Sequence, residues 1–251
     1  MSQQVDEARI DTESPSPIEL VFIWAGPVGL IGVFACWLFA GMMPPKPTPG
    51  WSAVQVADFF AENHLRVIVG QIGSLVAAVV LTAFFATVSM TMAQIEGKRP
   101  ILAVTQIAAW TTLLAFFFLP ATLWMVAAYR PGELDPEVIR MLNDFAWFCL
   151  LVPLTPMVLQ FACLACAVLR DRSPDPVWPR WFGWYTIQSA LVVPLSLVIP
   201  LVHNGPFTWN GILGFWIPAG DAGVVFIGLA VFMHLAWKRR HQAALAAAAT
   251  V

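Results

Sequence analysis

Asp221, His64 and His203 are the side chains in this sequence best suited to acid–base or metal chemistry. Asp221 stands inside an apolar run, from Ile212 to Trp237, which contains one other ionisable side chain, His234. The run is long enough to cross a bilayer. An ionised aspartate at mid-depth costs about 2.5–3.5 kcal/mol on insertion scales, so an acid in such a run indicates a function by default.

The surroundings of Asp221 leave several roles open. Ala219 and Gly223 flank it with the small-xxx-small spacing that lets another helix backbone approach closely. No Lys or Arg is expected at a matching depth on another span, so the carboxyl group has no evident counter-charge. We expect Asp221 to carry a proton, to act as a general acid or to contact a ligand. Alternatively, it is a structural group that bonds to Gln160 or to a carbonyl freed by Pro218.

His64 and His203 stand at the predicted outer ends of two other apolar runs, with Glu62 and Asp144 at similar depth. Two histidines and carboxylates suit a transition metal, and two facing imidazoles suit a haem iron. However, no HxxxH or HxxEH spacing supports such a site, and histidine at a membrane interface commonly serves as a polar cap. We therefore predict no metal or cofactor, with haem or a transition metal at His64 and His203 as the less favoured alternative.

The composition indicates an all-α integral membrane protein. Hydrophobic residues make up 59% of the chain and charged residues 11%, whereas soluble domains contain about 25% charged residues. The net charge of −2 and the absence of a basic stripe argue against a nucleic-acid partner. Apolar stretches predict transmembrane helices near residues 18–42, 65–92, 101–128, 145–170, 180–203 and 210–237.

The distribution of Lys and Arg predicts the orientation of these helices. Basic residues concentrate in the segments that face the cytoplasm if both termini lie there. We therefore predict a multi-pass protein of a cell membrane, plasma or inner, with a disordered acidic cytoplasmic tail over residues 1–17 and a second cytoplasmic tail over residues 238–251. The membrane domain occupies residues 18–237.

Prolines and polar residues predict an irregular outer half. Most prolines inside the spans fall in the half farther from the cytoplasm, where each removes a helical hydrogen bond and can open a pocket. The first outer loop is also predicted to contain a short amphipathic helix. We expect an outward-facing pocket with Asp221 at its floor and Gln160 at similar depth. Its polar rim would consist of Glu62, Asn63, His64, Asn143, Asp144, His203 and Asn210.

These features favour a protein that binds or transports a small lipophilic or amphipathic molecule. A first alternative is an intramembrane enzyme, such as an isomerase, cyclase or hydrolase, with Asp221 as proton donor and His64 or His203 as partner base. A second alternative is a non-catalytic subunit or scaffold. The expected partners are the lipid bilayer, a lipophilic ligand and either further copies of the chain or a larger membrane complex.

Overall fold

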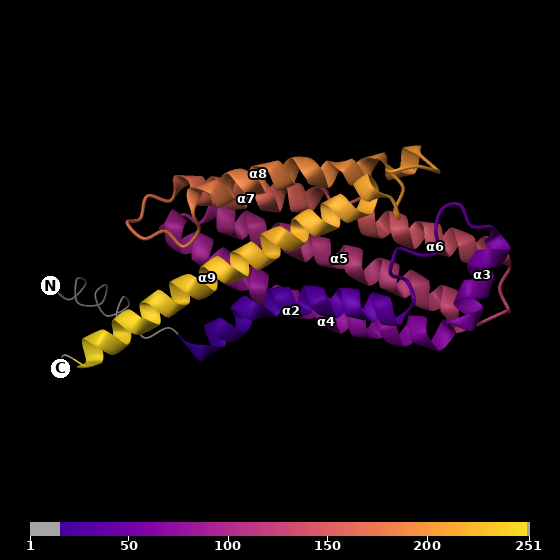
Figure 1. Ribbon diagram of the computed structural model, residues 1–251, viewed down its shortest axis with the longest axis horizontal. Helices are drawn as coiled ribbons and strands as arrows, with labels where there is room; N and C mark the ends of the chain where they lie inside the picture. Colours follow the sequence, from indigo (N-terminus) through magenta and orange to yellow (C-terminus); the bar gives the residue numbers. More distant parts are fainter. Residues whose placement is uncertain (1–15, 250–251) are drawn as a thin grey trace.

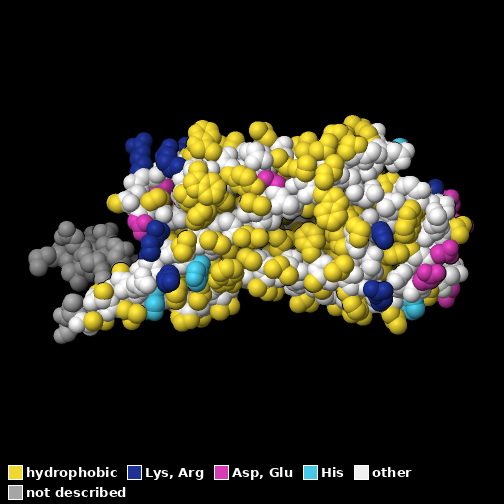
Figure 2. All heavy atoms as spheres, in the orientation of Figure 1, with side chains coloured by type: hydrophobic (Ala, Val, Ile, Leu, Met, Phe, Trp, Pro, Cys, Tyr) yellow, Lys and Arg dark blue, Asp and Glu magenta, His cyan; other side chains and the backbone are white. Residues whose placement is uncertain are grey.

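The computed structural model describes residues 16–249, which form helices and connecting loops without any strand. Six helical stretches are long and apolar enough to cross a membrane, which confirms the predicted fold class. Hydrophobic side chains cover the middle of the face shown in Figure 2, and charged side chains gather towards its two ends. The predicted disordered tail lies almost wholly in residues 1–15, outside the described part of the chain.

The helices run along the long axis of an elongated bundle (Figure 1). The start of α2 and the end of α9 lie at one end, here called the terminal end, and α3 crosses the other, here called the α3 end. The bounds are α2 (Pro17–Phe39), α3 (Ala53–Glu62), α4 (His64–Glu96), α5 (Ile101–Tyr129), α6 (Pro136–Leu151), α7 (Thr155–Arg170), α8 (Arg180–Val192), a 3₁₀ helix η1 (Val193–Leu201), a π helix η2 (Ile212–Trp216) and α9 (Ile217–Ala249).

Prolines interrupt the last three spans on the side nearer the α3 end. The predicted fourth helix is two helices, α6 and α7, separated by residues 152–154, with Pro153 in the break. The fifth span tightens into η1, which contains Pro194 and Pro200. The sixth opens with the π turn η2 just before Pro218. A proline lacks the amide donor of a regular helix and clashes with the preceding turn, so these irregularities follow from the sequence.

The amphipathic helix predicted in the first long loop is α3. Ser52 and Gln55 form a reciprocal capping box at its start. Val56 and Phe60 are buried against the bundle, whereas Asp58 is exposed. The loop before it is tied to the loop between η1 and η2 by the Trp209 indole, which donates a hydrogen bond of 2.9 Å to the backbone oxygen of Pro47. Together α3 and these loops close one end of the bundle.

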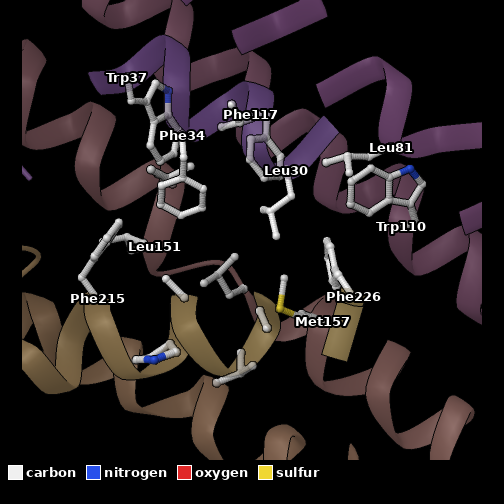
Figure 3. Close-up of a pocket in the computed structure, with 17 residues that line it drawn as sticks. Leu30, Phe34, Trp37, Leu81, Trp110, Phe117, Leu151, Met157, Phe215 and Phe226 are labelled. Carbon is white, nitrogen blue, oxygen red and sulfur yellow. The ribbon is translucent and has the colours of Figure 1, made fainter. Parts of the chain in front are cut away.

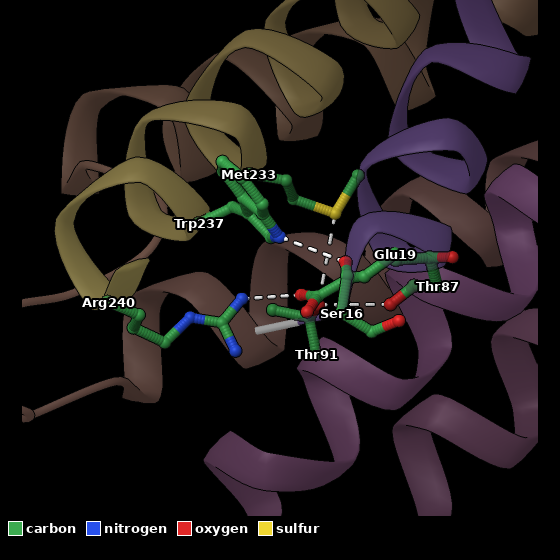
Figure 4. A network of polar contacts seen from close by, with 7 residues as sticks. All are labelled: Ser16, Glu19, Thr87, Thr91, Met233, Trp237 and Arg240. Carbon is green, nitrogen blue, oxygen red and sulfur yellow. Dashed lines mark hydrogen bonds and ion pairs between the residues drawn. The ribbon is translucent and has the colours of Figure 1, made fainter. Parts of the chain in front are cut away.

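At the terminal end, α9 is held against α2 by polar groups (Figure 4). The Trp237 indole donates to the backbone oxygen of Ser16 at 3.2 Å, and Arg240 forms an ion pair with Glu19. The helix continues from its predicted end at residue 237 to Ala249, because the alanine-rich segment has the strongest intrinsic helix propensity. The last turns of α9 therefore extend the sixth span into the segment predicted as a tail.

α2 and α4 approach each other closely through glycines. A Cβ atom added at Gly70 would lie 2.7 Å from the backbone oxygen of Cys36 and 2.8 Å from the Cβ of Ala40. A Cβ added at Gly26 would lie 2.5 Å from the ring of Phe84. Hydrocarbon lipid tails offer little hydrophobic force for helix association, so this close van der Waals packing is a main source of cohesion between the two helices.

Gly70→Ala is expected to destabilise the protein by about 1–3 kcal/mol, because the methyl group would overlap the α2 backbone. Gly220→Ala is the matched control, since an added Cβ there meets no atom within 4 Å and alanine favours a helix by about 1 kcal/mol over glycine. Thermal unfolding of the purified variants measures both effects. Equal unfolding temperatures would contradict glycine-dependent packing of α2 on α4.

Candidate functional site

A cavity of about 100 Å³ lies in the middle of the bundle (Figure 3). Apolar side chains from α2, α4, α5, α7 and α9 line it, and none of the lining residues is charged. The indole nitrogen of Trp110 lies on the side of its ring that faces away from Leu30 and Met157 (Figure 3). The labelled lining residues are Leu30, Phe34, Trp37, Leu81, Trp110, Phe117, Leu151, Met157, Phe215 and Phe226.

The helix breaks contribute much of this lining. Leu151 ends α6, Leu154 is the last residue of the break before α7, and Val193 begins η1. Phe215 and Pro218 stand on either side of the change from π to α geometry in the sixth span. The proline-rich half of the bundle therefore does surround a cavity, because irregular helices leave space that straight helices would fill.

The cavity opens sideways between α2 and α9. Leu30 and Phe34 on α2, and Ala219 and Ala222 on α9, are only half-buried although they line it. The surface in Figure 2 is hollowed near the middle of the face, between these two helices. Both helices are among those long and apolar enough to span a membrane.

Asp221 lies beside the cavity and faces α8. The Tyr185 hydroxyl donates a hydrogen bond of 2.8 Å to Asp221 Oδ1, and the Gln188 amide lies 3.5 Å from the same oxygen. Asp221 Oδ2 is buried without a partner. Successive helical residues point about 100° apart, so Ala222 faces the cavity while Asp221 turns towards the neighbouring helix. The expected bond to Gln160 is not formed.

The predicted polar rim is divided among separate places. Glu62, Asn63 and His64 stand at the junction of α3 and α4, where the Asn63 amide donates to the Phe59 oxygen at 2.9 Å. The His64 ring lies 3.0 Å from the Ala61 oxygen. These are local contacts that satisfy helix-end groups. None of the three residues reaches the cavity.

The remaining rim residues lie in surface hollows and in the bundle interior. His203 and Asn210 line a hollow of about 210 Å³ formed by loops at the α3 end. Asp144 lines a different surface hollow of about 340 Å³ on α6. Asn143 is fully buried and donates to Asp144 Oδ1 at 3.2 Å. Asp144 and His203 are close enough for their charges to interact, but the structure does not assemble all of these side chains into one rim.

No group of three or more His, Cys, Asp or Glu residues within residues 16–249 is arranged to hold a metal ion. His64 and His203 belong to the different environments just described, the α3–α4 junction and the loop hollow. Asp221 contacts neither of them, since its partners come from α8. The arrangement thus offers a carboxyl group bonded to a phenol, and beside it an apolar cavity.

Gln160 is placed differently from the other predicted residues. It is 2% exposed and lines a narrow void next to the cavity, which Gln106 also lines. Sequence reasoning missed Tyr185 and Gln188 as partners of Asp221. A usable signal was present, because the chain has only two tyrosines and Tyr185 lies inside a span.

The chain is thus a polytopic helical membrane protein with an apolar cavity at its centre. Comparison with protein-family models, curated protein sequences and solved structures finds no match. The physical features of the cavity and its neighbours therefore carry the functional argument.

Tyr185→Phe is expected to destabilise the protein by about 1–2 kcal/mol, because the hydroxyl bonded to Asp221 would be lost in an apolar environment. Tyr129→Phe is the matched control, since Tyr129 is exposed and phenylalanine keeps the ring beside Arg130. Thermal unfolding in a lipid nanodisc measures the difference. Equal stability of the two variants would show that the Tyr185–Asp221 bond contributes nothing specific.

Proposed function

We propose that this protein binds a small lipophilic molecule in its central cavity. The observation that carries the proposal is a cavity with an entirely apolar set of lining residues and an opening between two membrane-spanning helices. Apolar cavities of roughly this size in proteins stay dry and take up small hydrocarbons such as benzene. A ring or a short branched chain would fill the space, and a longer molecule would extend through the opening.

The bilayer is the natural source of such a ligand. A molecule dissolved among the acyl chains would enter between Leu30 and Phe34 of α2 and Ala219 and Ala222 of α9 without crossing water. Transport is an extension of this binding function, with the Asp221 carboxyl group as the group whose protonation would be coupled to it. In this proposal the chain spans a cell membrane with both termini in the cytoplasm, as the distribution of Lys and Arg favours.

An intramembrane enzyme is the second candidate function. It is supported by the unpaired Asp221 Oδ2 on the residue next to Ala222, which lines the cavity. Tyr185, which bonds to Asp221, replaces the histidines as its partner in this alternative. Asp221→Asn would abolish turnover or proton-coupled transport, because the amide cannot give or take the proton. Wild-type activity in this variant would exclude both proton-dependent functions.

Ala222→Phe is expected to abolish ligand binding, because the added ring would occupy the cavity. Val224→Phe is the matched control on the same helix, since Val224 is 53% exposed on the outer surface. Native mass spectrometry of gently purified protein should detect a stoichiometric lipophilic molecule on the wild type and on Val224→Phe.

The same measurement should find Ala222→Phe without that ligand, at an unfolding temperature close to that of Val224→Phe. Retention of the ligand by Ala222→Phe would place it elsewhere on the protein. A wild type that carries no lipophilic molecule, alone or in a complex with another subunit, would favour the scaffold alternative.

A further inference from the structure

The narrow void beside the cavity is lined by two strongly buried amide side chains that carry unpaired polar atoms. Gln106 and Gln160 both line it, and they are 1% and 2% exposed. Neither the amide nitrogen nor the oxygen of Gln160 has a hydrogen-bond partner, and the amide nitrogen of Gln106 has none either. A buried polar group without a partner costs about 1–3 kcal/mol, so these amides lower the free energy of unfolding.

The void lies one helical turn from the cavity, towards the terminal end. On α4, Leu81 lines the cavity and Phe85 lines the void, and on α9 Phe226 lines the cavity and Leu229 the void. The same relation holds for Trp110 and Gln106 on α5 and for Met157 and Gln160 on α7. A turn of α-helix rises about 5.4 Å, so the amides stand one layer of side chains away from the cavity.

Aromatic rings form that layer. The Phe85 ring stacks on Trp110 at a centroid distance of 4.3 Å and meets Phe226 edge-on at 5.0 Å. The void is too narrow in this conformation to hold a water molecule. Phe85 lines the void and packs on Trp110 and Phe226, which line the cavity, so a ligand group that reaches the amides has to displace the Phe85 ring.

The hydrogen bonds around Gln106 orient its amide. The Ser89 hydroxyl donates to Gln106 Oε1, and Ser89 also lies 3.0 Å from the Ala103 oxygen. With its oxygen engaged, Gln106 presents its unpaired NH₂ group as a donor. Gln160 offers both a donor and an acceptor. This pair of amides can therefore bond to a carbonyl oxygen or to a hydroxyl group.

We propose that Gln160 and Gln106 form the polar end of the ligand site, and that the ligand is an apolar molecule bearing a carbonyl or hydroxyl group at one end. This inference rests on the proposed binding function and names its ligand class. The apolar body of the ligand fills the cavity, and its oxygen passes Phe85 to bond to the amides. The buried amides then have a partner in the bound state, which accounts for polar side chains in an otherwise apolar interior.

A pair of ligands that differ only in the oxygen tests this assignment. The two probes are 4-fluoroacetophenone and 4-fluoro-α-methylstyrene, which have nearly the same shape but carry a carbonyl and a methylene group respectively. Their dissociation constants are measured by fluorine NMR on wild-type protein in nanodiscs, with Ala222→Phe as the blank for partition into lipid. Gln160→Leu removes the amide, and Gln94→Leu makes the same change at an exposed site on α4.

Gln160→Leu is expected to weaken ketone binding about five- to tenfold, the loss of one net hydrogen bond, and to leave alkene binding unchanged. Its unfolding temperature should stay the same or rise, because a buried polar group without a partner is removed. Gln94→Leu should bind both probes as the wild type does. Gln160→Met repeats the test with an unbranched side chain if the leucine variant does not fold.

Unchanged ketone binding by Gln160→Leu, or an equal loss for both probes, would overturn the polar end of the site and leave cavity binding intact. A lower unfolding temperature with unchanged ketone binding would show that the amide is structural and would overturn it as well. If neither probe bound the wild type better than Ala222→Phe, the binding function itself would fail, and the polar end with it.

Discussion

Close packing of α2 on α4 is the constraint on which the central cavity depends. Gly70 lets α4 approach the α2 backbone at Cys36, and Gly26 leaves room for the Phe84 ring of α4. α2 is thereby held on its α4 side, and it meets α9 through polar groups at the terminal end. Between these fixed contacts, the bulky side chains of Leu30 and Phe34 face α9 across a space that they do not fill.

The proline breaks complete the enclosure from the other side. A straight helix through residues 136–170 would present one continuous apolar face, but the break at residues 152–154 spreads its leucines around the cavity. The 3₁₀ helix η1 in the fifth span and the π helix η2 in the sixth span also interrupt a straight helix and place side chains at the cavity. At membrane depth such irregular backbone is tolerated where it is buried in protein or lines a cavity. Here it lines an apolar cavity.

Polar groups inside the bundle are few, and their placement follows the cost of desolvation. Glu96 sits at the helix end, where its two oxygens accept from the amides of Leu102 and Ala103 at 2.8 and 2.7 Å. Such a carboxylate also interacts favourably with the N-terminal end of the α5 dipole. Asp221 has a single strong hydrogen-bond partner in Tyr185, and the side-chain amide of Gln160 has no hydrogen-bond partner. Asp221 and Gln160 are thus two of several residues with unpaired buried polar atoms, and both lie next to the cavity or the void.

Local sequence patterns account for the elements: the apolar runs define six spans, and the amphipathic pattern around Val56 defines α3. Prolines mark the breaks in the last three spans, whereas Pro27 and Pro120 lie inside the helices α2 and α5. These features depend on residues close together in the chain. Tertiary packing alone places Asp221 beside Tyr185, brings Gln160 and Gln106 to the same void, and opens the cavity between α2 and α9. Each depends on how helices rotate and pack against partners distant in the chain. Hydropathy carries little information about that rotation, because lipid-facing and buried positions are equally apolar.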